Sequence, residues 1–209
     1  MFSFAPSMDK REYIIHSAMA LFAEKGFDNT SIREISNKAG VNVAMVSYYF
    51  GSKEKLFEAM IEQKSNFLKT KLEQLCKDET MSEMQKINKL ISDYVTRILE
   101  NPAYHRILHQ QMLLNARPEL NTMIKSLFCE NTRYIRKIFE AGIAKGEFRE
   151  VDIELTIISM FGTISQFLQR AYLFTDNQEE FNNSQYPEEI RIRLESHLQQ
   201  MMQAHLLKN

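Results

Sequence analysis

The chain has 209 residues, of which 44% are hydrophobic and 25% charged, and its formal net charge at pH 7 is −1. This composition is typical of a globular protein with one or two domains, and it excludes a uniformly basic nucleic-acid binder. Only 6 glycines and 4 prolines interrupt the chain, and no segment alternates as a strand does, so the sequence predicts an all-α fold.

The predicted elements are nine helices. Helical periodicity, capping residues and glycines place them at about 9–25, 32–39, 43–50, 52–76, 81–100, 102–115, 118–144, 152–174 and 187–207. Gly26, Gly40 and Gly51 follow the first three helices, in the position where glycine favours a helix end. Ser31 and Glu34 have the spacing of a capping box at the start of the second helix.

The second and third helices are separated by one short turn at Gly40, which is the spacing of a helix-turn-helix motif. In that motif the second helix lies in the major groove of DNA. Small and apolar side chains can contact thymine methyl groups, and tyrosine hydroxyls can reach phosphates. The third helix contains no Arg, Lys or Asn, so Arg33 is the best candidate to read a base by hydrogen bonds. The residues predicted to face outward from the third helix are Val43, Ala44, Met45, Ser47, Tyr48 and Tyr49.

This region also resembles the signature of a known family. The stretch TSIREISNKAGVNVAMVSYYFGSKEKLF, residues 30–57, resembles the DNA-binding signature of TetR-family transcriptional regulators, and the preceding ALFAEKGFDNTSIREI resembles that family's first helix and turn. The likeness covers about 50 residues, from Tyr13 to Met60. It implies an all-helical protein with an N-terminal helix-turn-helix DNA-binding domain over 1–51 and a ligand-binding and dimerisation domain over 52–209.

The resemblance implies a function and the residues that carry it. The function is sequence-specific regulation of transcription, most readily by a repressor that binds a palindromic operator as a homodimer and responds to a small molecule. Tyr48, Tyr49 and Lys53 match phosphate contacts, and Lys53 begins the fourth helix, where backbone N–H groups also favour an anion. The full set implied to touch DNA is Thr30, Ser31, Arg33, Val43, Ala44, Met45, Tyr48, Tyr49 and Lys53.

Several residues of the longer helices are candidates for a ligand site. Their spacing alone is explained more simply by core packing, and only the resemblance favours a cavity lined by some of them. His105 and His109 have a spacing that can bind a metal on one helix face, but no Cys, Asp or Glu beside them completes a site. We expect no metal and no cofactor. The candidates are Tyr94, His105, Met112, Phe128, Tyr134, Phe161 and Phe167.

The last two predicted helices are apolar over more than one face. A stripe wider than one core requires favours a homodimer through these two helices, although closing the core of one chain is the simpler alternative. No G-x-S-x-G, Walker or dinucleotide-binding motif is present, so the sequence does not predict an enzyme. Other functions that remain open are an all-helical small-molecule binding protein, an adaptor for another protein and a transcriptional activator.

The cysteines and apolar runs favour a cytoplasmic protein. Cys76 and Cys129 have no paired spacing, which is typical of reduced thiols. No run of about 18 uninterrupted apolar residues exists, and the first residues lack the basic and apolar regions of a signal peptide. We therefore expect a cytoplasmic chain with no membrane span.

Overall fold

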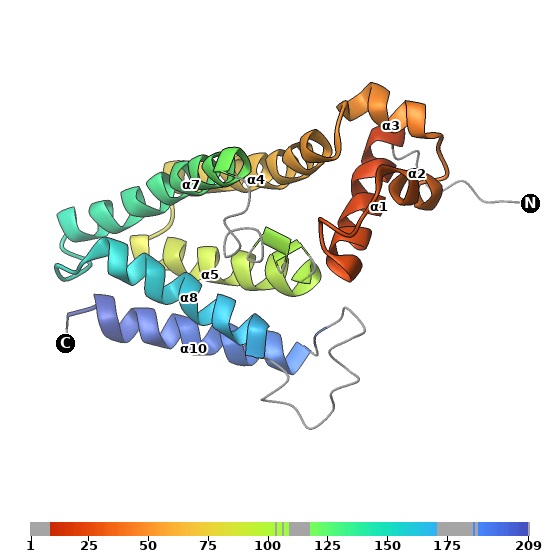
Figure 1. The fold of residues 1–209 in the computed structure, drawn as a ribbon. Helices are drawn as coiled ribbons and strands as arrows, with labels where there is room; N and C mark the ends of the chain where they lie inside the picture. The colour runs from red at the N-terminus through yellow and green to blue at the C-terminus, as the bar shows by residue number, and fades with distance from the viewer. Residues whose placement is uncertain are drawn as a thin grey trace, which may run out of the picture. The chain divides into compact units, whose positions relative to one another are not determined.

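The computed structural model describes residues 9–102, 104–105, 107–108, 118–170, 186 and 188–208. Within these ranges every regular element is a helix, which confirms the predicted all-α fold (Figure 1). Where the structure describes both ends of a predicted helix, the bounds agree to within about two residues; the helix predicted over 102–115 lies mostly outside the described residues. The helices are α1 Lys10–Lys25, α2 Ile32–Lys38, α3 Val43–Phe50, α4 Lys53–Lys77, α5 Glu83–Glu100, α7 Pro118–Ala144, α8 Ile153–Arg170 and α10 Glu188–Leu206.

The described residues group into two compact units. The first holds those within Met1–Asn66 and Ala103–Lys125, and the second holds those within Phe67–Pro102 and Ser126–Asn209. The division therefore falls inside α4 and inside α7. The functional boundary expected between residues 51 and 52 stays a prediction. None of the described helices has both the length and the apolar character needed to cross a membrane.

An aromatic cluster forms the centre of the first unit. Phe22 of α1, Phe27 of the following turn and Phe57 of α4 are at most 2% exposed, and their ring centroids lie 5.1–5.6 Å apart. Around this cluster α1 packs against α2, and α2 packs against α3. Three buried phenylalanines remove a large apolar area from water, so the turn after α1 and the first turns of α4 are held against α1.

Helix α5 supplies the centre of the second unit. Its apolar residues recur at helical spacing and form one buried face. Helix α10 packs against α5 (Figure 1), and its buried residues Leu194, Leu198, Met202 and Leu206 join the same core. The buried face of α5 consists of Met84, Ile87, Leu90, Ile91, Val95, Ile98 and Leu99.

The chain reverses direction after α7 through a close contact between Gly142 and Phe148. Phe148 is 1% exposed, and its backbone N–H donates to the carbonyl oxygen of Gly142 at 3.0 Å. A Cβ atom at position 142 would lie 2.2 Å from Cδ2 of the Phe148 ring. The missing side chain therefore provides the space that the ring occupies. Gly146, with φ of +73°, supplies the left-handed backbone that the turn requires.

Candidate nucleic-acid interface

Two capped helices form the α2–α3 motif. Ser31 and Glu34 make the expected capping box: the backbone N–H of Glu34 donates to the Ser31 hydroxyl oxygen at 3.2 Å, and the backbone N–H of Ser31 donates to Glu34 Oε2 at 2.8 Å. Asn42 begins α3 by accepting from the Met45 N–H at 2.7 Å. Gly40, with φ of +65°, turns the chain between the two helices.

Helix α3 has one buried face and one exposed face. Val46 and Phe50 are 1% and 8% exposed, and Ile35 of α2 is fully buried, so these residues anchor the motif. On the other face Tyr48 is 85% exposed and Val43 is 41% exposed. Exposed apolar and aromatic side chains that gather on one short helix are typical of a binding surface.

The remaining outward residues of α3 surround Tyr48. Ala44 and Ser47 are exposed, while Met45 is only half exposed. Tyr49 is 36% exposed, and its ring lies edge-on to the Tyr48 ring with 5.5 Å between the centroids. The structure therefore brings together on one surface the third-helix residues predicted from the sequence.

Charged side chains of α2 lie beside the capping box. Arg33 is exposed. The ammonium group of Lys25 lies 2.8 Å from Glu34 Oε1, and this hydrogen bond, together with those from Ser31, lowers the pKa of Glu34 to about 2. The stability contributed by the Glu34 carboxylate is present above its ordinary pKa of 4.5 and is lost as the pH falls through about 2. At neutral pH the carboxylate is ionised and favours the N-terminus of α2.

Thr30 has a role inside the protein. Its side chain is 1% exposed, and its hydroxyl donates to the carbonyl oxygen of Gly26 at 2.8 Å and to that of Leu21 at 3.3 Å. These bonds join the end of α1 to the start of α2. The buried hydroxyl does not favour the DNA contact that the resemblance implies for Thr30, because it lies outside the exposed surface of the motif.

Lys53 also points inward. Its ammonium group donates to the carbonyl oxygens of Phe27 and Thr30, each at 2.8 Å, with Asp28 O at 3.4 Å, and lies 4.4 Å from the centroid of the Phe27 ring. Lys53 thereby ties the first turn of α4 to the loop between α1 and α2. A phosphate contact by this residue requires its ammonium group to leave carbonyl oxygens that it already satisfies.

Replacing Lys53 by methionine tests these two roles. The variant keeps the aliphatic stem but removes the charged donor to the carbonyl oxygens of Phe27 and Thr30, of which Phe27 O keeps the Thr30 N–H at 3.3 Å. We therefore expect the free energy of unfolding to fall by about 1–3 kcal/mol. Denaturant unfolding of Lys53→Met and of the matched variant Lys55→Met measures the difference. The ammonium group of Lys55 pairs with Glu58 at 2.6 Å on the surface, so its loss is expected to change stability by less than about 1 kcal/mol. Unchanged stability of Lys53→Met with reduced DNA binding would assign Lys53 to phosphate alone.

The predicted ligand-binding residues that the structure describes are divided between the two units and among several contacts. Tyr94 of α5 and Phe161 of α8 contact each other, with 4.6 Å between ring centroids. Tyr134 and Phe167 line two different cavities of the second unit, and Phe128 is 43% exposed on α7. His105 is half-buried and belongs to the first unit, whereas Met112 and His109 lie outside the described residues.

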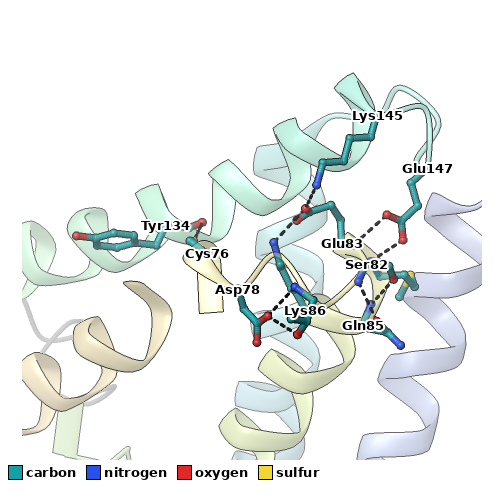
Figure 2. Close-up of polar contacts among 11 residues, drawn as sticks. Cys76, Asp78, Ser82, Glu83, Gln85, Lys86, Tyr134, Lys145 and Glu147 are labelled. Carbon is teal, nitrogen blue, oxygen red and sulfur yellow. Dashed lines mark hydrogen bonds and ion pairs between the residues drawn. The ribbon is translucent and has the colours of Figure 1, made fainter. Parts of the chain in front are cut away.

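One polar group was not predicted from the sequence. Glu83 is 1% exposed, and it pairs with Lys86, three residues along α5, and with Lys145, the residue after α7 (Figure 2). In the sequence, Glu83 and Lys86 are indistinguishable from a solvated surface pair. Only the proximity of Lys145, 62 residues later, marks them as part of a buried cluster, and no local pattern reveals it.

Two parts of the chain match family models. A model described as bacterial regulatory proteins, tetR family, matches residues 14–60, and one described as tetracyclin repressor-like, C-terminal domain, matches residues 80–169. The HTH-type transcriptional repressor NicS of Pseudomonas putida is 36% identical over 152 residues, which cover 70% of this chain and 68% of NicS. The probable HTH-type transcriptional regulator YttP of Bacillus subtilis is 28% identical over 193 residues, covering 89% of this chain and 92% of YttP.

Solved structures share the fold over almost the whole length. The transcriptional regulator FadR from Bacillus subtilis, determined in complex with stearoyl-CoA, has a TM-score of 0.74 at 21% identity and covers 91% of this chain and 96% of its own. At this identity the likeness concerns the fold alone. The capped motif with its exposed third helix, the two matching family models and the identity to NicS lead to one conclusion. The chain belongs to the tetR family of bacterial regulatory proteins and is a DNA-binding transcriptional regulator.

Proposed function

We propose that the protein is a ligand-responsive repressor that binds a near-palindromic operator as a homodimer in the cytoplasm, and that it is not an enzyme. The observation that carries the proposal is the exposed face of α3 in a capped helix-turn-helix, where Tyr48 is 85% exposed. The repressor role is supported by NicS, which is described as a transcriptional repressor. An activator with the same interface is the alternative, because both kinds of regulator bind operators.

The proposed DNA surface consists of α3 and the start of α2. Val43, Ala44 and Met45 offer apolar contacts to bases, Arg33 offers hydrogen bonds, and the tyrosine hydroxyls offer contacts to phosphates. The third helix itself carries no charge. Residues 30–55 hold four basic side chains and two acidic ones, which gives a net charge of +2 for each helix-turn-helix domain. Dimerisation doubles this charge and therefore strengthens attraction to the DNA backbone. Ser31, Arg33, Val43, Ala44, Met45, Ser47, Tyr48 and Tyr49 form the proposed surface.

The proposed dimer surface lies on α8 and α10. Leu155 and Ile158 of α8 are 61% and 62% exposed, and Ile192 of α10 is 54% exposed. Side chains of α8 and α10 also line a groove of about 980 Å³, which includes Phe167 and Ile190. Large apolar side chains at this exposure are unfavourable in water, and a second copy of the chain related by a two-fold axis would cover them.

Ligand response follows from a shift between conformations. An effector releases the operator only if it binds the conformation that cannot span two half-sites more tightly than the one that can. Successive half-sites on one face of DNA lie about 34–36 Å apart, so a change in the spacing of the two heads is sufficient. The effector is proposed to bind in the C-terminal part of the chain, to which Tyr94 and Phe161 belong.

The test is a fluorescence anisotropy titration of the purified protein with DNA from upstream of its own gene. A scrambled duplex of the same length is the competitor, and the titration is repeated at two salt concentrations. We expect binding by a dimer that resists the competitor and weakens as salt rises. Binding no tighter than to the scrambled duplex would contradict the proposal and favour the small-molecule binding protein.

Tyr48→Ala tests the placement of the interface. Loss of one hydrogen bond to a charged phosphate weakens binding about tenfold per head, so a dimer that makes the contact twice is expected to lose about a hundredfold in operator affinity. The free energy of unfolding should be unchanged, because the Tyr48 side chain is exposed. Tyr13→Ala is the matched control, since Tyr13 of α1 is 51% exposed and lies outside the α2–α3 motif. Equal losses in the two variants would place the interface elsewhere.

A further inference from the structure

Helix α3 has few groups that can recognise a base by specific hydrogen bonds. Its sequence is VAMVSYYF, which contains no Arg, Lys, Asn, Gln, Asp or Glu. Ser47 offers a hydroxyl, which can hydrogen-bond to more than one base and therefore does not specify one. Asn42 precedes the helix, but its side-chain oxygen accepts from the Met45 N–H at 2.7 Å. A bidentate contact with adenine uses the same oxygen and so competes with the N-cap of α3.

Apolar side chains occupy the N-terminal turn of the exposed face instead. Val43 is 41% exposed, and Ala44 is exposed beside it. Positions 43, 44, 47 and 48 lie within about 140° of one another around the helix axis, so they share one face. In helix-turn-helix proteins the N-terminal residues of the recognition helix contact the base edges. The two residues of α3 that are best placed to read bases therefore offer only apolar contacts.

Thymine is the base that such side chains can distinguish. In the major groove its C5-methyl group is apolar, whereas guanine and adenine present hydrogen-bond donors and acceptors. An apolar side chain that packs against this methyl group removes apolar area from water. The same side chain against guanine or adenine would cover polar atoms without giving them a hydrogen bond, which is unfavourable. Val43 and Ala44 therefore favour thymine over the purines at the positions they contact.

The packing of α3 fixes the place of these methyl groups. Val46 and Phe50 are buried on the other side of the helix, and the Asn42 cap holds its first turn. Val43 is β-branched, which in a helix leaves one strongly preferred χ1 rotamer. The apolar surface is therefore ordered before DNA binds, and little side-chain entropy is lost when it meets a base.

We infer that Val43 and Ala44 read the operator through thymine methyl groups, so that each half-site presents thymine to the N-terminal turn of α3. The two residues lie about 1.5 Å apart along the helix axis, so they reach the same base pair or adjacent ones. The hydrogen-bonded contact with a base then comes from Arg33, which is exposed on α2. This inference rests on the proposed function and names the base that the interface recognises.

The test removes the methyl groups and leaves base pairing and charge unchanged. The DNA fragment from upstream of the gene is prepared once with thymine and once with uracil in place of every thymine. The full-length protein is titrated with each fragment by fluorescence anisotropy in the presence of the scrambled competitor. Loss of one buried methyl group weakens binding about fourfold, so a dimer that contacts one in each half-site is expected to lose about fifteenfold or more.

Two variants distinguish a methyl contact from an effect of uracil on DNA shape. Val43→Ala removes most of the apolar side chain, so the ratio of the affinities for thymine and uracil DNA should fall several-fold toward one. Arg33→Gln is the matched control from the same surface. It should weaken binding to both fragments about tenfold or more and leave their ratio at the parent value. Both side chains are exposed, so neither substitution is expected to prevent folding.

The outcomes separate this inference from the proposed function. Tight, competitor-resistant binding with equal affinity for thymine and uracil DNA would overturn the inference and leave the proposed function standing. A uracil effect that persists unchanged in Val43→Ala would overturn it as well, because the methyl groups would then act away from Val43. Binding of neither fragment more tightly than the scrambled duplex would overturn the proposed function, and this inference with it.

Discussion

Ile158→Glu is expected to convert the protein to a monomer and to reduce operator affinity by at least about a hundredfold. The side chain is 62% exposed on α8, beside Leu155 at 61%. If a two-fold axis passes through this surface, the substitution places two carboxylates in one apolar contact, where neither has a partner. The helix-turn-helix of a monomer then loses the high effective concentration that a linked second copy provides. That effect contributes about a hundredfold or more to operator affinity.

Sedimentation over a range of protein concentrations measures the first effect, and anisotropy with operator DNA measures the second. Phe128→Glu is the matched control, since Phe128 is an exposed apolar residue of α7, at 43%, outside α8 and α10. It should leave both the oligomeric state and DNA affinity unchanged. A dimeric Ile158→Glu variant would place the interface on another surface.

Gly142→Ala is expected to lower the free energy of unfolding by about 1–3 kcal/mol. Helix propensity alone predicts the opposite sign, because alanine is better than glycine in a helix interior by about 1 kcal/mol. The added Cβ, however, would lie 2.2 Å from Cδ2 and 2.3 Å from Cε2 of the Phe148 ring. Phe148 is buried in the core and cannot move aside without displacing the turn after α7.

Denaturant unfolding of three variants isolates this contact. Gly162→Ala is the control in α8, where a Cβ atom meets no other atom within 4 Å, and it should be neutral or stabilising. In the background of Gly142→Ala, Phe148→Leu should recover part of the loss, because the smaller side chain leaves room for the methyl group. If Gly142→Ala were as stable as the parent, the close approach of the ring would not determine stability.

Local signals were sufficient to predict the motif. Ser31 with Glu34, Asn42 and the three glycines act within a few residues of one another, so their effect on helix ends can be derived from spacing alone. The alternation of buried and exposed positions in α3 follows from the same helical period. These features also carried the family resemblance, which the comparisons confirm.

Long-range contacts could not be predicted in this way. Thr30 and Lys53 look like polar surface residues in the sequence, yet both bond to carbonyl oxygens of the loop between α1 and α2. Glu83 meets Lys145 only because α5 and α7 lie together in the folded chain. Periodicity shows which face of a helix is buried, but it does not show which distant side chain that face meets.

The contacts of Lys53 and Phe57 indicate that the shortest stable DNA-binding fragment must include the first turns of α4. Phe57, Leu56 and Met60 of α4 are fully buried, and Phe57 completes the ring cluster with Phe22 and Phe27. A peptide that ends at Gly51 would keep every proposed DNA contact of α2 and α3. It would lose the buried side chains of α4 against which α1 packs. Gly51, between α3 and α4, is therefore not expected to act as a flexible hinge. A movement of the first turns of α4 is therefore expected to move α1, α2 and α3 with it.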